Sequence, residues 1–139
     1  MAHGDPGLRS IVFDCAQPAS LAHWWAETIP GYHVRAYTEE GLAWLREQGI
    51  KDPEDDPSVV IDPDGAGPTI WFNRVPEPKA AKNRVHIDVN VRAPEDIDRL
   101  IKRGASVVRP LDAVPDEPWA ILADPEGNEF CAFPPHEEG

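Results

Sequence analysis

Apolar and polar residues alternate along several short segments, and a period of two is typical of strands with one buried face and one wetter face. The clearest alternation runs from Val85 to Val91, where apolar residues flank His86, Asp88 and Asn90. Other segments with similar composition also predict strands, at residues 10–16, 32–37, 59–61, 69–72, 106–108, 119–122 and 128–133. The pattern therefore predicts a chain built largely from short strands.

Apolar residues at helical spacing predict three helices between these strands. Two of them follow a proline and all three stop at a glycine, as helices commonly do. They cover the region from Pro18 to Gly31, residues 39–48, and the region from Pro94 to Gly104. Strands and helices together predict an α+β fold.

Two parts of the chain match each other at an offset of 76 residues, which aligns Ser10 with His86 and Pro18 with Pro94. The turns Asp62-Pro-Asp-Gly and Asp124-Pro-Glu-Gly match at an offset of 62. The sequence therefore predicts two tandem βαβββ units, of which the first is longer. We expect its extra length around residues 38–57.

These boundaries predict one domain of two units joined by a polar connector. The units span residues 10–75 and 85–134, and the connector spans residues 76–84. Residues 1–9 and 135–139 are expected to be disordered, because they are short terminal segments without a predicted element.

The duplicated unit and its turns resemble the vicinal-oxygen-chelate superfamily, and most of all its glyoxalase-like branch. The segments that carry the resemblance are Phe13-Asp-Cys15, Trp24-Trp25, Val75-Pro-Glu-Pro-Lys79, Lys82-Asn-Arg-Val-His-Ile-Asp88 and Ala123-Asp-Pro-Glu-Gly-Asn-Glu-Phe-Cys131. The resemblance implies a curved mixed sheet with helices on its convex side. It also implies a concave small-molecule site, here called the cup, that is lined by both units, and a homodimer.

Strand alternation, together with the face expected of each strand in this family, selects the side chains that line the cup. In the second unit these are His86, Asp88, Asn90 and Glu129. In the first unit the same parity selects Ser10, Asp14, Thr69 and Trp71. An aromatic wall at Trp71 would suit a planar or cationic ligand, although an ordinary core position is the alternative.

Metal-dependent members of the superfamily carry four ligand positions, on the first and last strand of each unit. His86 and Glu129 match two of these positions, whereas the repeat places Ser10 and Thr69 at the other two. The ligand set for zinc, nickel, iron or manganese is thus incomplete, since catalytic metals generally take three protein ligands. Asp88 or Asp14 would be needed as a further ligand.

Two functions follow from this arrangement, and the sequence does not decide whether the protein is an enzyme. In the first, a metal-free cup binds or sequesters a small molecule, with His86 and Glu129 as a hydrogen-bonded pair capable of general-base catalysis. In the second, a divalent metal on those residues serves a lyase, isomerase or dioxygenase. A third reading, in which the protein works through its surface, requires that no pocket be present.

Charge and composition limit the partners further. A formal net charge of −12 disfavours nucleic acid and anionic membranes. We find no long apolar stretch and no signal sequence, which predicts a cytoplasmic protein. The two cysteines, Cys15 and Cys131, are expected on opposite sheet faces, which predicts reduced thiols. An acidic pocket would attract a cationic ligand, whereas the basic cluster of Lys79, Lys82 and Arg84 would hold an anionic one if it lies at the cup rim and is not simply solvated; the sequence does not choose between them.

Overall fold

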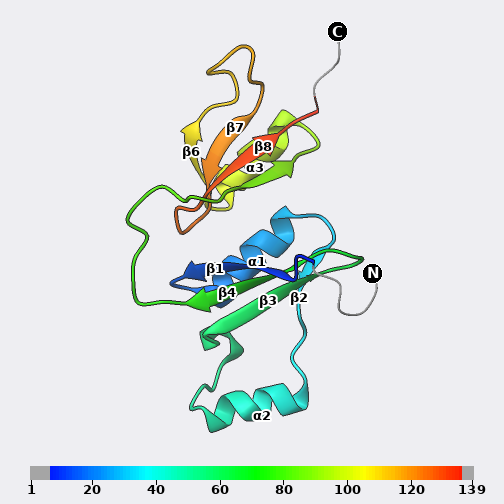
Figure 1. Ribbon diagram of the computed structural model, residues 1–139, viewed down its shortest axis with the longest axis vertical. Coiled ribbons are helices and arrows are strands. Elements are labelled where there is room, and N and C mark those ends of the chain that lie inside the picture. Colours follow the sequence, from blue (N-terminus) through cyan, green and yellow to red (C-terminus); the bar gives the residue numbers. More distant parts are fainter. Residues whose placement is uncertain (1–6, 136–139) are drawn as a thin grey trace. The chain divides into compact units, whose positions relative to one another are not determined.

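The computed structural model describes residues 7–135, and the chain divides into two compact units, Met1–Pro78 and Lys79–Gly139 (Figure 1). The expected disorder of residues 1–9 and 135–139 therefore falls mainly on positions outside the described residues. Each unit contains one four-stranded sheet in which parallel and antiparallel pairs are mixed. The α+β class predicted from the sequence is confirmed.

Unit 1 follows the βαβββ order with a helical insertion. Its elements are β1 (Ser10–Cys15), α1 (Pro18–Thr28), β2 (Tyr32–Val34), α2 (Glu39–Glu47), the short 3-10 helix η1 (Pro53–Asp55), β3 (Ser58–Pro63) and β4 (Thr69–Arg74). The strands lie in the order β1-β4-β3-β2, with β1 parallel to β4. The extra length of the first unit is thus α2 and η1, at the position expected from the repeat, and Figure 1 shows α2 well separated from α1.

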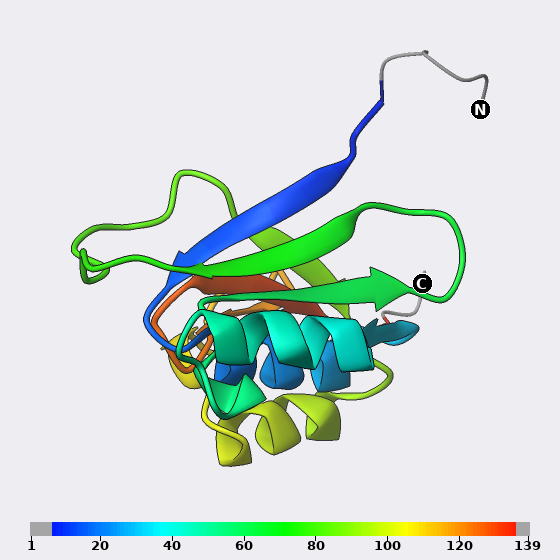
Figure 2. The same cartoon turned by 90° about the horizontal axis from the view of Figure 1, so that it is seen from below.

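Unit 2 repeats the same topology without the insertion. Its elements are β5 (Ile87–Asn90), α3 (Pro94–Lys102), β6 (Ser106–Arg109), β7 (Ala120–Ala123) and β8 (Glu129–Phe133). The strand order β5-β8-β7-β6, with β5 parallel to β8, matches that of unit 1. In Figure 2 the strands β1 (blue), β4 (green) and β3 (blue-green) of unit 1 lie next to one another in this order. The predicted duplication is therefore confirmed in strand order and direction.

Two predicted strands are each three residues shorter in the structure. The first, expected at residues 32–37, ends at Val34, because the chain must leave the sheet to enter α2 at its cap residue Thr38. The second, expected at residues 85–91, is β5 and begins only at Ile87, opposite Phe130. Val85 lies outside the strand and is 77% exposed, so the predicted strand alternation from Val85 to Val91 does not hold at its first residue.

Burial along the strands shows which face of each sheet is covered. In unit 1, α1 packs on β2, β3 and β4, and an aromatic cluster of Phe13, Trp25 and Phe72 fills the space between helix and sheet. The ring centroids of Phe13 and Phe72 are 5.2 Å apart, and Phe72 is fully buried. Because side chains alternate along a strand, Ser10, Asp14 and Trp71 lie on the opposite face of sheet β1-β4-β3-β2, away from α1.

In unit 2, α3 lies over the face of the sheet that carries Leu122, Phe130 and Ala132, all of which are buried. The other face carries Glu129, Cys131 and Phe133 of β8, by the alternation of the strand. We call it the open face of unit 2. No helix among the described residues is long and apolar enough to cross a membrane.

Candidate functional site

A pocket of about 280 Å³ lies on the open face of unit 2. Its lining comes from the connector, from β6, β7 and β8, and from His86 just before β5. The lining residues are Lys82, His86, Val108, Ile121, Glu129, Phe130 and Cys131. Two of the sequence-predicted residues, His86 and Glu129, therefore share this pocket, as strand parity indicated.

The Glu129 carboxylate is held by the connector. One oxygen, Oε2, accepts a hydrogen bond of 3.0 Å from the backbone N–H of Asn83, and the other, Oε1, accepts one of 3.1 Å from the Lys79 ammonium. Burial alone would raise the pKa of Glu129, but these contacts outweigh it and the pKa is lowered. Glu129 is thus an ionised carboxylate whose charge is neutralised by Lys79.

His86 does not form the predicted hydrogen-bonded pair with Glu129. Within the described residues its closest carboxylate is that of Asp88, with 3.7 Å between His86 Nδ1 and Asp88 Oδ1. This distance is too long for a hydrogen bond. Both oxygens of the Glu129 carboxylate instead accept hydrogen bonds from Lys79 and Asn83 of the connector.

A second group of polar side chains gathers next to His86. A nitrogen of His86, a carboxylate oxygen of Asp88 and the sulfur of Cys131 all lie within 4.8 Å of one another. Asp88 and Cys131 are direct partners in the parallel register of β5 and β8. Cys131 was missed as a site residue, although the parity that selected Glu129 also places it on the same face.

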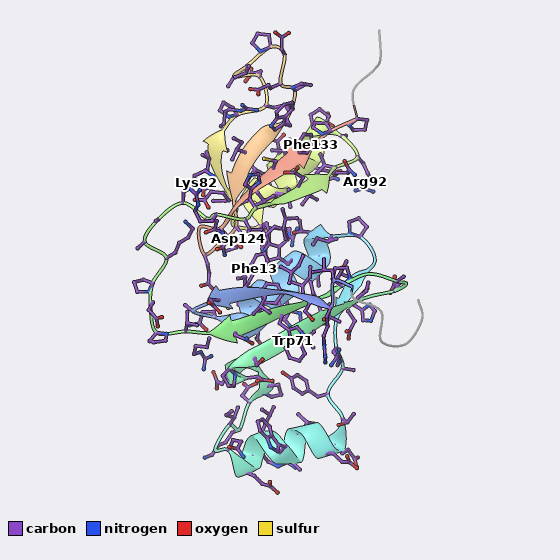
Figure 3. All side chains as sticks on the ribbon, viewed as in Figure 1. Phe13, Trp71, Lys82, Arg92, Asp124 and Phe133 are labelled. Atoms are coloured by element: carbon purple, nitrogen blue, oxygen red, sulfur yellow. The ribbon has the colours of Figure 1, made fainter. Side chains whose placement is uncertain are left out.

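Asn90 lies farther along β5, opposite Phe133, and is exposed. Beside it, Phe133 stacks on Trp119 with centroids 5.1 Å apart, and the Arg109 guanidinium lies 5.3 Å from the Trp119 ring. Figure 3 labels Phe133 on β8 and Lys82 on the connector. The open face thus carries an aromatic and cationic group beyond the pocket that the sequence reading missed.

In unit 1 the corresponding face is already occupied by its own side chains. The hydroxyls of Ser10 and Thr69, which are register partners, share a hydrogen bond of 2.7 Å. The Arg35 guanidinium lies 5.7 Å from the Trp71 ring centroid and forms two hydrogen bonds with Asp62. Trp71 is therefore not in the buried core, and the guanidinium that lies beside its ring is that of Arg35 from the same unit.

Asp14 continues the row of Ser10 along β1 and is exposed, opposite Asn73 of β4. Ser10, Asp14, Thr69 and Trp71 thus share one face of their sheet. A cup lined jointly by both units stays a prediction, since the pocket described above is lined by unit 2 alone.

The chain matches one known sequence family over nearly its whole length. The family profile of the glyoxalase-like domain covers residues 10–133. The chain belongs to the glyoxalase-like domain family. A search of curated proteins gives no significant match to this glyoxalase-like domain.

Solved structures show the same fold at low sequence identity. A glyoxalase/bleomycin resistance protein/dioxygenase family enzyme from Burkholderia phytofirmans PsJN is 16% identical, with a TM-score of 0.59 over 93% of this chain and 98% of that one. A member of the same superfamily from Sphaerobacter thermophilus DSM 20745 is 15% identical, with a TM-score of 0.59 over 94% and 98%. A fosfomycin resistance protein from Mesorhizobium loti is 13% identical, with a TM-score of 0.55 over 93% and 91%.

The residues at the four ligand positions of metal-dependent members do not suit a metal in this glyoxalase-like domain. Ser10 and Thr69 offer only neutral hydroxyls, and these are hydrogen-bonded to each other. Glu129 is engaged by a lysine and a backbone amide. Only His86 keeps an available ligand atom at these positions, and one imidazole does not hold a first-row metal.

Proposed function

We propose that this glyoxalase-like domain binds or sequesters a compact organic anion with an apolar body in the pocket of unit 2. The observation that carries the proposal is the ammonium of Lys82, which lines the pocket and makes no hydrogen bond or ion pair with any described residue. Val108, Ile121 and Phe130 supply an apolar lining. A ligand with a carboxylate on an apolar body would satisfy both features.

The charges around the pocket support an anion rather than a cation. The one carboxylate of the lining, Glu129, already has Lys79 as its counter-ion at 3.1 Å. Lys82 is therefore the uncompensated charge of the lining. The acidic net charge of the chain argues for a cationic ligand only at long range, where salt screens it.

The proposal is binding without turnover. The predicted general base would need Glu129 to orient the imidazole of His86, and Glu129 is bound elsewhere. The alternative of a metal-dependent lyase, isomerase or dioxygenase would need the four family positions, whose residues do not suit a metal. We therefore place no reaction step on this pocket.

Titration with benzoate and with benzamide, its neutral counterpart, tests the proposal. The titration is performed in the presence of a chelator. The backbone amide signals of Val108, Ile121 and Cys131 in nuclear magnetic resonance spectra report binding, and we expect only benzoate to bind. A Lys82→Ala variant should weaken that binding about tenfold to a hundredfold, the size of one charge-assisted hydrogen bond. The matched Lys51→Ala variant, changed in an exposed loop of unit 1, should bind as the wild type does.

Equal binding of benzamide and benzoate, or full binding by the Lys82→Ala variant, would count against an anion site. Shifts confined to residues outside the pocket would count against the pocket itself.

We also infer a homodimer and a reducing, cytoplasmic setting. The dimer rests on the superfamily resemblance, and the setting rests on Cys15 and Cys131, which are both buried and form no disulfide. Sedimentation equilibrium over a range of protein concentrations would test the dimer, and a purely monomeric mass would refute it.

A further inference from the structure

Three side chains of unit 2 place three different kinds of ligand atom close together. They are His86, Asp88 and Cys131, whose nitrogen, oxygen and sulfur atoms lie within 4.8 Å of one another. Two of them are direct partners across β5 and β8, so the register of a parallel strand pair holds them side by side. We propose that these three residues form a binding site for a single borderline divalent cation, with Zn²⁺ as the best match.

The donor set decides the class of metal. Imidazole, carboxylate and thiolate together suit Zn²⁺ or Co²⁺, whereas Mg²⁺ and Ca²⁺ require oxygen ligands. Three protein ligands leave a fourth tetrahedral position open to water or to a ligand in the adjoining pocket, which His86 and Cys131 also line.

The spacing permits coordination after a small side-chain adjustment. Tetrahedral bonds of the usual lengths place ligand atoms about 3.3–3.8 Å apart, and the closest approach of His86 Nδ1 to Asp88 Oδ1 is already 3.7 Å. The side chains of His86 and Asp88 are 44% and 60% exposed, so their rotamers are free to move toward a cation. Cys131 is 7% exposed and provides the fixed point of the site.

At the three-residue cluster itself, the carboxylate of Asp88, which is not part of the pocket lining, leaves a place for a cation. Burial raises the pKa of the Cys131 thiol, and the neighbouring Asp88 carboxylate raises it further, because a thiolate beside a carboxylate is unfavourable. A divalent cation between the two groups removes that repulsion and stabilises the thiolate. Arg109 and Lys82 lower the pKa of the Cys131 thiol, but burial and Asp88 outweigh them.

This site differs from the superfamily's metal positions and does not depend on the proposed anion. It shares only His86 with those positions, and Glu129 is left with Lys79 and Asn83. The sulfur ligand gives the site a spectroscopic signature that a site made of His86 and Glu129 would lack.

The test is a titration of the untagged full chain with Co²⁺ alone, after treatment with a chelator and under reducing conditions. We expect one equivalent to bind, with tetrahedral visible bands and a sulfur-to-cobalt charge-transfer band in the near ultraviolet, and we expect Zn²⁺ to displace it. Cys131→Ser should abolish the charge-transfer band and weaken Co²⁺ binding at least tenfold. Cys15→Ser, which alters the other buried cysteine, should change neither.

Three further variants keep the test decisive if Cys131→Ser fails to fold. His86→Ala and Asp88→Asn alter exposed side chains and should each weaken Co²⁺ binding at least tenfold. Glu129→Gln should bind Co²⁺ as the wild type does, because Glu129 is not a ligand in this site.

Several outcomes would overturn the inference. These are no binding of Co²⁺, binding without a charge-transfer band, loss of the band in Cys15→Ser, and loss of binding in Glu129→Gln. Benzoate binding is measured with a chelator present, so failure of the cation site and failure of the anion pocket remain distinguishable.

Discussion

At the scale of single residues, the buried Asp124 carboxylate organises the turn that leads into β8. Asp124 is 2% exposed, and its Oδ1 accepts hydrogen bonds from the backbone N–H groups of Glu126 and Asn128. The Asn128 side chain donates to both of its oxygens. Gly127 completes the turn with φ near 90°, a conformation that favours glycine. The turn motif thus supports the strand that presents Glu129 and Cys131.

Replacement Asp124→Ala should lower the free energy of unfolding by about 2–4 kcal/mol, because two backbone N–H groups and an amide would lose their acceptor. Equilibrium denaturation with urea measures the change. Asp112→Ala, at an exposed position of the same unit, is the control and should shift stability by less than about 0.5 kcal/mol. A comparably small effect of Asp124→Ala would show that the turn does not need the carboxylate.

Glu129 makes stability depend on pH. Its pKa in the folded protein is lowered from the ordinary value of 4.5, so its stabilising contribution is present above that value and is lost as the pH falls through the lowered pKa. The wild type should therefore exceed Glu129→Gln in stability at pH 7, and the difference should shrink steadily below about pH 4.5. Urea denaturation of both proteins across this range measures it. A difference that is constant with pH would contradict the assigned charge state.

At the scale of elements, α2 is an insertion held at both of its ends. Thr38 caps its first turn by accepting a hydrogen bond from the backbone N–H of Gly41. Before that cap, the Tyr37 hydroxyl donates to the buried Asp56 carboxylate at 2.7 Å, which joins the segments on either side of the helix. Burial and Asp56 both raise the pKa of Tyr37, so the hydroxyl keeps its proton throughout the physiological range.

Replacement Tyr37→Phe should loosen α2 without unfolding the sheet. Among the described residues, Asp56 would keep only its hydrogen bond from the backbone N–H of Ser58, and we expect local opening to become easier by about 1–2 kcal/mol. Hydrogen exchange of the amides of Glu39–Glu47 measures this directly. Tyr32→Phe removes a hydroxyl that donates to the Pro68 carbonyl in the same unit, and it should leave exchange in α2 unchanged. Equal acceleration in both variants would refute a specific role for Tyr37.

At the scale of the whole molecule, acidic residues outnumber basic ones by 25 to 13, and the net charge is −12. Self-repulsion of such a surface opposes the compact state, and salt screens it. Individual ion pairs such as Arg92 with Asp96 are exposed on the arginine side and offset little of this repulsion. The overall charge is therefore a property of the surface and is separate from the basic group that lines the pocket.

Stability should rise with salt at neutral pH and lose this dependence near the isoelectric point. Raising sodium chloride from about 10 mM to about 500 mM shortens the screening length from about 30 Å to a few ångströms, so the thermal midpoint at pH 7 should increase. At a pH near 4.7, where the net charge is close to zero, the same change should have little effect. Differential scanning calorimetry measures both. An equal salt effect at the two pH values would show that repulsion is not its source.

Local patterns along the chain predicted most of the elements, the duplication and the sheet face of most strand residues. Period-two alternation predicted that Glu129 and the row of Ser10 and Asp14 lie on the faces away from α3 and α1, because side-chain direction along a strand is a local property. His86 lies just before β5 and lines the pocket beside Glu129. The repeat located the insertion that became α2. The motif Asp124-Pro-Glu-Gly predicted its turn, because such turns depend on local hydrogen bonds and on glycine.

Contacts between these side chains could not be predicted from the sequence, because they depend on how distant segments pack. Glu129 receives its partners from Lys79 and Asn83, which are 50 and 46 residues away in the chain. Cys131 meets Asp88 through the register of β5 and β8, and alternation fixes the face of a residue but not its neighbour on the next strand. Contacts across a sheet and contacts from a connector join residues that are far apart in the sequence, so they form only in the folded chain. For that reason the sequence predicted the open face of unit 2, and only the folded structure brought together the residues from which the anion pocket and the cation site are proposed.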